Sequence, residues 1–160
     1  MREAIGGTWL LGLVLTFIVI FASFLAISIN YTKAFNVKNN IVDLISKYEG
    51  NNCNAREKIG NYLKDVGYLV PGDCSKADPD GIYSYYGYNL DGNRVTSGKA
   101  YYCVSMDSTE DTTTMDKRFY RVIVFFKLDL PLVSELATFR VKGETESIMF
   151  VTDEAERVSC

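Results

Sequence analysis

The feature that most restricts what this chain can fold into is an uncharged apolar stretch near its N-terminus. It runs from Thr8 to Ile29 and reads TWLLGLVLTFIVIFASFLAISI. About 20 consecutive apolar residues suffice for a helix to cross the hydrocarbon core of a bilayer. The sequence therefore predicts a transmembrane helix over residues 8–29, preceded by a short N-terminal segment, residues 1–7.

A cleaved signal peptide is the alternative for this stretch, because Ala26-Ile27-Ser28 fits the small-x-small pattern of a cleavage site. However, the apolar region of a signal peptide is usually only about 7 to 15 residues long. The sequence after the candidate site also continues in helical register. We therefore expect an uncleaved anchor.

The helix is expected to continue beyond the membrane, since the chain contains neither proline nor glycine between Leu13 and Glu49. Apolar residues recur there at helical spacing; they are Tyr31, Phe35, Val37, Ile41, Val42, Leu44, Ile45 and Tyr48. This pattern predicts an amphipathic continuation over residues 30–50, with Gly50 as its C-terminal stop. The whole helix would be at least about 55 Å long at 1.5 Å per residue.

The remaining residues, 51–160, are expected to form one extracytoplasmic domain of the α+β class. Its first predicted element is a short helix over Ala55–Tyr68 that ends at Gly67 and Pro71. A hairpin of Gly81–Leu90 and Lys99–Met106 around the turn Asp91-Gly92-Asn93 follows. A central strand is predicted over Phe119–Leu130, and two short strands, Ala137–Lys142 and Ser147–Thr152, around a turn at Gly143. The predicted architecture is a single long helix packed on a small, mainly antiparallel sheet.

Four cysteines follow the apolar stretch: Cys53, Cys74, Cys103 and Cys160. An even number in a small exported domain is typical of disulfides. A zinc site is disfavoured, because no two of these cysteines are separated by only two to four residues. We expect two disulfides and, among the three possible pairings, favour Cys53 with Cys74 and Cys103 with Cys160. Disulfides place the domain outside the cytosol and the N-terminus in the cytoplasm, an orientation that the few flanking charges hardly decide.

Several kinds of chemistry are missing from the sequence. The chain has no histidine, which removes the Ser-His and Cys-His nucleophilic arrangements and the commonest transition-metal ligand. It also lacks a P-loop and a nucleophile-elbow motif. Its net charge of -3 gives no basic stripe for nucleic acid. The sequence therefore predicts a protein that is not an enzyme and has no cofactor, no small-molecule substrate and no nucleic-acid partner.

Three further groups of residues each have two possible interpretations. The acidic clusters Asp78-Pro79-Asp80-Gly81 and Asp107, Glu110, Asp111 and Asp116 lack EF-hand spacing, so turns and a solvated loop are favoured over calcium sites. The tyrosines at 83, 85, 86, 88, 101 and 102 could form a contact face, but sheet residues with half of them facing the core are favoured. Asn30-Tyr31-Thr32 is a glycosylation sequon too close to the bilayer for us to assign it a role.

Within the apolar stretch, small or weakly polar residues fall near one face of the helix: Thr8, Gly12, Thr16 and Ser23. Such rows permit close packing of helices in membranes, although chance placement is about equally plausible. They are the candidate helix-packing residues.

A long N-terminal helix, apolar and then amphipathic, followed by a disulfide-bearing sheet domain resembles the type IV pilin-like proteins. Gly7-Thr8-Trp9 and the segment FKLDLPLVSELATFRVKGETES, which contains Leu130, Pro131 and Arg140, are loosely similar to the TadE-like pseudopilins of tight-adherence (Tad) pili. The chain departs from the pilin pattern at Gly12, where counting from Gly7 would place a glutamate. The resemblance implies a structural subunit or minor pseudopilin that packs with other pilin-like subunits in a bacterial surface filament or secretion machine. The alternative is a single-pass envelope protein whose outer domain binds a partner or ligand.

Overall fold

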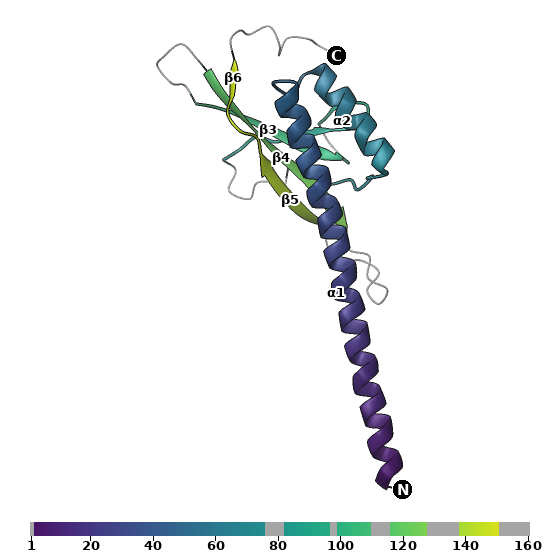
Figure 1. The fold of residues 1–160 in the computed structure, drawn as a ribbon. Coiled ribbons are helices and arrows are strands. Elements are labelled where there is room, and N and C mark those ends of the chain that lie inside the picture. Colours follow the sequence, from purple (N-terminus) through teal and green to yellow (C-terminus); the bar gives the residue numbers. More distant parts are fainter. Residues whose placement is uncertain (1, 76–81, 97–98, 110–115, 128–137, 151–160) are drawn as a thin grey trace.

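The structure, a computed structural model, describes residues 2–75, 82–96, 99–109, 116–127 and 138–150. Its elements are α1 (Arg2–Lys47), α2 (Cys53–Val66), β1 (Tyr86–Tyr88), β2 (Arg94–Val95), β3 (Tyr102–Thr109), β4 (Asp116–Lys127), β5 (Thr138–Glu144) and β6 (Ile148–Phe150). The prediction of a long N-terminal helix with a small antiparallel sheet is confirmed (Figure 1).

All strand pairs in the sheet are antiparallel, in the order β2-β1-β3-β4-β5, with β6 also paired to β4. The predicted central strand is confirmed as β4, which pairs with β3 along one edge and with β5 and β6 along the other. A strand with partners on both edges and buried side chains on both faces needs a continuous apolar run. The run Val122–Phe126 supplies it, and all five residues are buried.

The predicted antiparallel pairing of Gly81–Leu90 with Lys99–Met106 is confirmed, since β1 pairs with β3, but the turn at Asp91-Gly92 does not join these two strands directly. It connects β1 to the two-residue strand β2, while β3 pairs with the other edge of β1. Gly92 adopts φ 76°, a left-handed conformation that favours glycine. The pair Arg94–Val95 is too short to produce a strand pattern in the sequence, which is why the sequence does not predict β2 between the two paired strands.

The predicted turn at Gly143 is wrong, because Gly143 lies inside β5 and pairs with Val122. β5 and β6 run along the same edge of β4, with Arg121 opposite Glu144 and Arg118 opposite Ile148. One extra residue therefore lies on the β5–β6 side, which is the arrangement of a β-bulge. At this point the hydroxyl of Thr145 accepts the N–H of Tyr120 at 3.0 Å, and the Thr145 N–H donates to the Tyr120 carbonyl at 2.9 Å.

Successive residues of β4 face two different apolar clusters. Tyr120, Val122, Val124 and Phe126 belong to the main core, which is covered by α1 and α2. Ile123 and Phe125 face the opposite side, where they pack with Cys103 and the partly buried Val70, Cys74 and Tyr85. Because successive side chains of a strand point to opposite faces of the sheet, one continuous apolar run provides buried side chains to both clusters.

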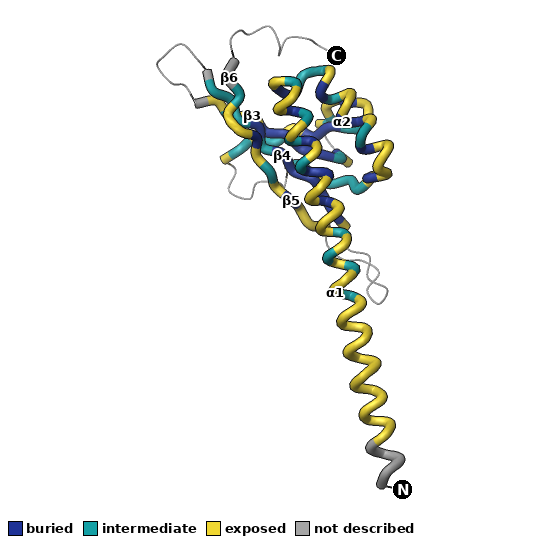
Figure 2. Tube along the Cα trace, viewed as in Figure 1, coloured by how far each residue is buried: buried dark blue, intermediate teal, exposed yellow. Residues whose placement is uncertain are grey.

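The second half of α1 forms one side of the main core (Figure 2). Its buried stripe is Ala34, Val37, Ile41 and Ile45, at the spacing of three and four residues that one helix face requires. Lys38 is also buried, with its stem over Gly143, where a Cβ would overlap it, and its ammonium 4.2 Å from the Phe35 ring centroid. Tyr31 and Phe35 belong to the predicted apolar face, but both remain exposed.

The two helices end in the same way. At the end of α2, Gly67 lies in the left-handed region, its N–H donates to the Lys64 carbonyl, and the Tyr68 N–H donates to Leu63. At the end of α1, the Glu49 N–H donates to Ser46 and the Gly50 N–H donates to Ile45. Both pairs of bonds form the Schellman motif. The predicted stop at Gly50 is one residue late, since Glu49 with φ 54° occupies the left-handed position.

One disulfide is found within the described residues, and it contradicts the favoured pairing. Cys74 is bonded to Cys103, with a Cα–Cα distance of 5.8 Å. Cys103 lies on β3 and points to the outer face of the sheet, where the segment after α2 returns across it. The predictions that Cys53 pairs with Cys74 and that Cys103 pairs with Cys160 are therefore both wrong, because the segment after α2 brings Cys74 across the outer face of the sheet to Cys103. Cys160 lies outside the described residues.

Candidate functional site: the exposed apolar helix

The first half of α1 carries most of the large exposed apolar side chains that the structure describes and is therefore the candidate functional site. The structure describes one helix that is long and apolar enough to cross a membrane, and none of its most apolar window is buried. In Figure 2 this half projects away from the sheet, and residues 7–22 are exposed. Trp9, Phe17 and Ile29 are each at least two-thirds exposed. Soluble domains seldom leave so large an apolar surface uncovered.

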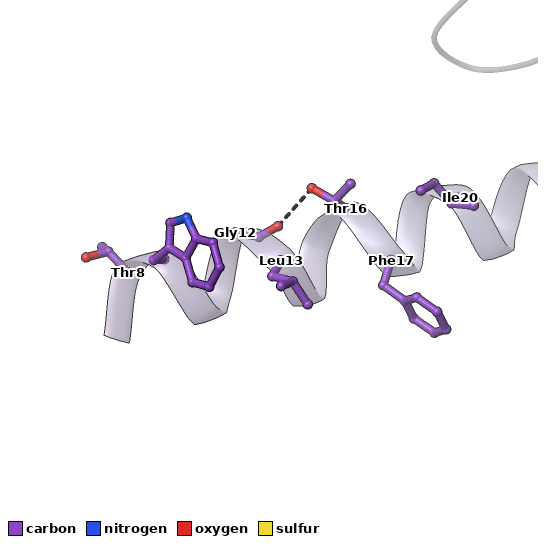
Figure 3. A pocket seen from close by; sticks show the side chains of 7 residues that line it. Thr8, Gly12, Leu13, Thr16, Phe17 and Ile20 are labelled. Carbon is purple, nitrogen blue, oxygen red and sulfur yellow. Dashed lines mark hydrogen bonds between the residues drawn. The ribbon is translucent and has the colours of Figure 1, made fainter. Parts of the chain in front are cut away.

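A shallow groove runs along this surface at Gly12 (Figure 3). Its lining residues are Thr8, Trp9, Gly12, Leu13, Thr16, Phe17 and Ile20. The groove exists because Gly12 has no side chain, and a Cβ built there would meet no atom within 4 Å. The indole of Trp9 and the side chains of Leu13 and Thr16 stand around this gap. A hollow of this kind can receive a side chain or the backbone of another helix.

The hydroxyl groups in this half of α1 bond to the helix itself. Thr16 donates to the Gly12 carbonyl at 2.9 Å, and Ser23 donates to the Val19 carbonyl at 2.8 Å. Both are bonds to the residue four positions earlier. Because each hydroxyl is satisfied within its own helix, neither needs water, and both are compatible with an apolar surrounding.

The structure brings three of the four predicted helix-packing residues into one feature. Thr8, Gly12 and Thr16 all line the groove. Ser23 lies further along the helix and is not part of the lining. The larger residues of the lining, Trp9, Leu13, Phe17 and Ile20, were not predicted as site residues. The sequence could have indicated them, because each lies one or four positions from a residue of the predicted row and is therefore close to it on the helix.

The outer face of the sheet carries a second polar cluster, centred on Arg121 of β4. Its guanidinium lies 3.2 Å from a carboxylate oxygen of Asp107 and 3.2 Å from one of Glu144, and it stacks 3.7 Å from the Tyr83 ring centroid. Burial lowers the pKa of Arg121, but the hydrogen bond with Asp107 and the charge of Glu144 outweigh burial and hold this pKa above its ordinary value. One guanidinium thus bridges two carboxylates, and the cluster joins β3, β4 and β5.

The predicted acidic clusters contribute little that the structure describes. Residues 78–81, 110 and 111 lie outside the described residues, as does the side chain of Asp116. Asp107 is described, and its carboxylate is bonded to Arg121. In the described part of the chain no three potential metal-ligating side chains come together.

The predicted tyrosine series divides between the core and the surface, as we expected for sheet residues of which about half face the core. Tyr88 and Tyr102 are buried in the main core and stack at 5.3 Å between ring centroids. Burial, and to a smaller degree Tyr88, raises the pKa of Tyr102, whose hydroxyl has no hydrogen-bond partner among the described atoms. Tyr86 is exposed and lies under Arg94, at 3.6 Å from its ring centroid. These contacts are internal to the sheet domain.

Comparisons with family models, curated proteins and solved structures give no match to this chain. The fold and its exposed helix are therefore the basis for an interpretation of function.

Proposed function

We propose that this chain is a pilin-like structural subunit or minor pseudopilin of a bacterial surface filament or secretion machine. The observation that carries this proposal is the use of α1 in two roles along one unbroken helix of 46 residues. Its second half supplies Ala34, Val37, Ile41 and Ile45 to the core of the sheet domain. Its first half presents an apolar surface that no other described part of the chain covers.

The physical argument begins with the exposed surface. Water disfavours apolar area by about 25 cal/mol per Å², so residues 8–29 need another environment. They extend over about 33 Å at 1.5 Å per residue, which matches the ~30 Å hydrocarbon core of a bilayer. A bilayer and a bundle of identical helices are both suitable environments. A pilin-like subunit uses both in turn, first as an anchored protein and then in a filament core.

The continuity of α1 favours a filament over a simple anchor. The described helix has no proline and no break where it enters the sheet domain, so displacement of its first half moves the domain as well. Packing of the apolar halves against one another would therefore fix the spacing and orientation of the sheet domains. The groove at Gly12 is the place where a neighbouring helix could approach most closely.

The proposed topology places the N-terminus in the cytoplasm and the sheet domain outside the cell membrane. The disulfide between Cys74 and Cys103 supports this orientation, because disulfides persist in oxidising compartments. The proposal assigns the chain a structural role with other pilin-like subunits as partners, without catalysis.

The test is to shear surface material from cells that produce the native chain and to locate the chain by mass spectrometry. Recovery of the chain in the sheared filament fraction is the expected result, and the N-terminal peptide would reveal whether the chain is trimmed at Gly7. Recovery exclusively in the membrane fraction would reject the filament role. It would favour a single-pass envelope protein that carries a binding domain.

A further inference from the structure

The sheet domain has an unusual surface where α1 leaves it. Four large apolar side chains are exposed there: Tyr31 and Phe35 from α1, Leu69 from the segment after α2, and Phe139 from β5. Lys33 of α1 and Lys127 at the end of β4 line a pocket together with Leu69. We call these six residues the collar. Figure 1 shows that the ends of β4 and β5 reach α1 at this level.

The aromatic part of the collar is held together by ring contacts. The ring of Tyr31 lies 6.3 Å from that of Phe35 and meets the Phe126 ring edge-on at 6.0 Å. Phe126 in turn stacks on Phe139 at 5.3 Å. Because Phe126 is buried, the two exposed rings from α1 and the one from β5 rest on a fixed base. This surface is therefore already formed in the isolated chain.

The polar part of the collar lines a pocket between α1 and the segment 67–71. Its lining includes Asn30, Lys33, Tyr68, Leu69 and Lys127. Among the residues that the structure describes, this lining contains two lysines, one asparagine and no acidic residue. The ammonium of Lys33 lies 5.9 Å from the Tyr68 ring centroid. Such a lining suits an anionic group that carries an apolar part.

The position of the collar along α1 identifies that group. Asn30 follows Ile29, the last residue of the apolar stretch. Lys33 lies only about 6 Å beyond Ile29 along the helix axis, at 1.5 Å per residue. The headgroup region adds about 5 to 8 Å to each side of the hydrocarbon core. The collar therefore lies at the level of the lipid headgroups, where tyrosine, other aromatic residues and lysine are favoured.

We propose that the collar is a membrane-docking surface that seats the sheet domain on the bilayer and binds the phosphate of an anionic phospholipid between Lys33 and Lys127. This inference rests on the proposed membrane anchoring of α1. The apolar side chains Leu69 and Phe139 enter the interface beside α1. The sheet domain is thereby held against the membrane surface until the subunit leaves it.

The test uses the full chain in vesicles of phosphatidylglycerol and phosphatidylcholine. Trp9 is the one tryptophan of the chain, so Trp9→Phe provides a background without that fluorophore. Leu69→Trp in this background reports on the collar, and Phe21→Trp reports on insertion of the helix. Quenching by lipids spin-labelled at the headgroup or in the acyl chain then measures each position separately.

The expected result is blue-shifted emission of the Leu69→Trp reporter, with stronger quenching by headgroup-labelled phosphatidylglycerol than by labelled phosphatidylcholine. Each lysine should contribute roughly five-fold to the preference for phosphatidylglycerol. Lys33→Gln together with Lys127→Gln should therefore abolish this preference. Lys47→Gln together with Lys58→Gln removes the same charge from exposed positions away from the collar and should leave the preference intact.

Four results would overturn the inference. A water-exposed, unquenched reporter at position 69, with the Phe21→Trp reporter still quenched by acyl-chain labels, would reject docking while the anchor stands. Blue-shifted emission without lipid quenching would show that protein covers the collar instead. Equal quenching by both lipids, unchanged in the Lys33 and Lys127 variant, would reject phosphate recognition. Loss of quenching at Phe21→Trp would reject the membrane anchor itself.

Discussion

Single residues at the ends of the two helices show how local strain is distributed in this chain. The left-handed position is filled by Gly67 after α2 but by Glu49 after α1. Residues with a Cβ pay about 1 to 2 kcal/mol for this conformation, whereas glycine adopts it freely. The end of α1 is therefore the more strained of two otherwise equivalent caps.

Replacement of Glu49 by glycine should stabilise the sheet domain. We expect Glu49→Gly to raise the free energy of unfolding by up to about 1 kcal/mol, because it relieves the left-handed strain. Chemical denaturation of the full chain in detergent, followed by circular dichroism, measures this change. Gly67→Ala is the matched control and should have the opposite sign; a gain of stability in both variants would contradict the argument.

Tyr68 should make the folded domain sensitive to alkaline pH. Its hydroxyl donates to the Phe125 carbonyl at 2.5 Å, and burial raises the pKa of Tyr68 from 10.0 to about 12. The unfolded chain therefore loses this proton at lower pH than the folded chain. The stabilising effect is complete below pH 10, and stability falls between pH 10 and 12, by at most about 1.4 kcal/mol per pH unit.

The tyrosinate absorbance of the folded chain should accordingly show late-titrating groups, and Tyr68→Phe should remove one of them while the buried Tyr102 remains. Tyr31→Phe changes an exposed tyrosine and serves as the control. If both variants titrate as the native chain does, the hydroxyl of Tyr68 is not protected in solution.

At the scale of elements, the junction between β5 and β6, which both pair with the same edge of β4, depends on one side chain. The hydroxyl of Thr145, which is buried, accepts the N–H of Tyr120 at the bulge. In a regular ladder a backbone carbonyl would fill this role. The side chain therefore replaces a backbone partner where the extra residue has displaced it.

Thr145→Val should lower the free energy of unfolding by about 1 to 3 kcal/mol, because it leaves the Tyr120 N–H unpaired in a buried place. Hydrogen exchange of the Tyr120 amide should accelerate in the same variant. Thr145→Ser keeps the hydroxyl and should retain most of the native protection. Equal loss in both variants would mean that the methyl group, not the hydroxyl, is important.

In the first half of α1, one face carries the groove at Gly12, and the proposed packing between helices uses this face and not the opposite one. We expect Gly12→Leu to reduce recovery in the sheared filament fraction by at least ten-fold, because it fills the groove and prevents close approach of a second helix. Val14→Leu enlarges a side chain on the opposite face and is the control. Equal recovery of the native chain and the Gly12→Leu variant would identify α1 as a passive anchor.

At the scale of the whole molecule, the covalent connections join elements on both faces of the sheet. Cys74–Cys103 closes a sequence separation of 29 residues on the outer face. Cys53 begins α2 on the other face and is not free. Within one chain, Cys160 is the remaining partner for it.

Peptide mapping under non-reducing conditions should therefore recover Cys74 joined to Cys103 and Cys53 joined to Cys160. Reduction should release both pairs and lower the stability of the domain by about 2 to 4 kcal/mol for each bond. A mapped peptide that joins Cys53 to a second copy of Cys53 would instead indicate a covalent dimer.

The sequence by itself determined the long helix, the central strand and the class of fold, because each depends on a pattern within one segment. The uncharged run from Thr8 to Ile29 and the run Val122–Phe126 leave few alternatives to a lipid-compatible helix and a doubly buried strand. The row of Thr8, Gly12 and Thr16 also followed from helical spacing alone.

Only the tertiary structure decided which distant segments meet. The pairing of Cys74 with Cys103, the bulge that joins β5 to β6, and the addition of the two-residue strand β2 to β1 all depend on contacts that no local pattern in the sequence encodes. The same holds for the collar. Tyr31 and Phe35 fit the periodicity of a buried helix face, but the sheet domain ends at their level and leaves them exposed beside Leu69 and Phe139.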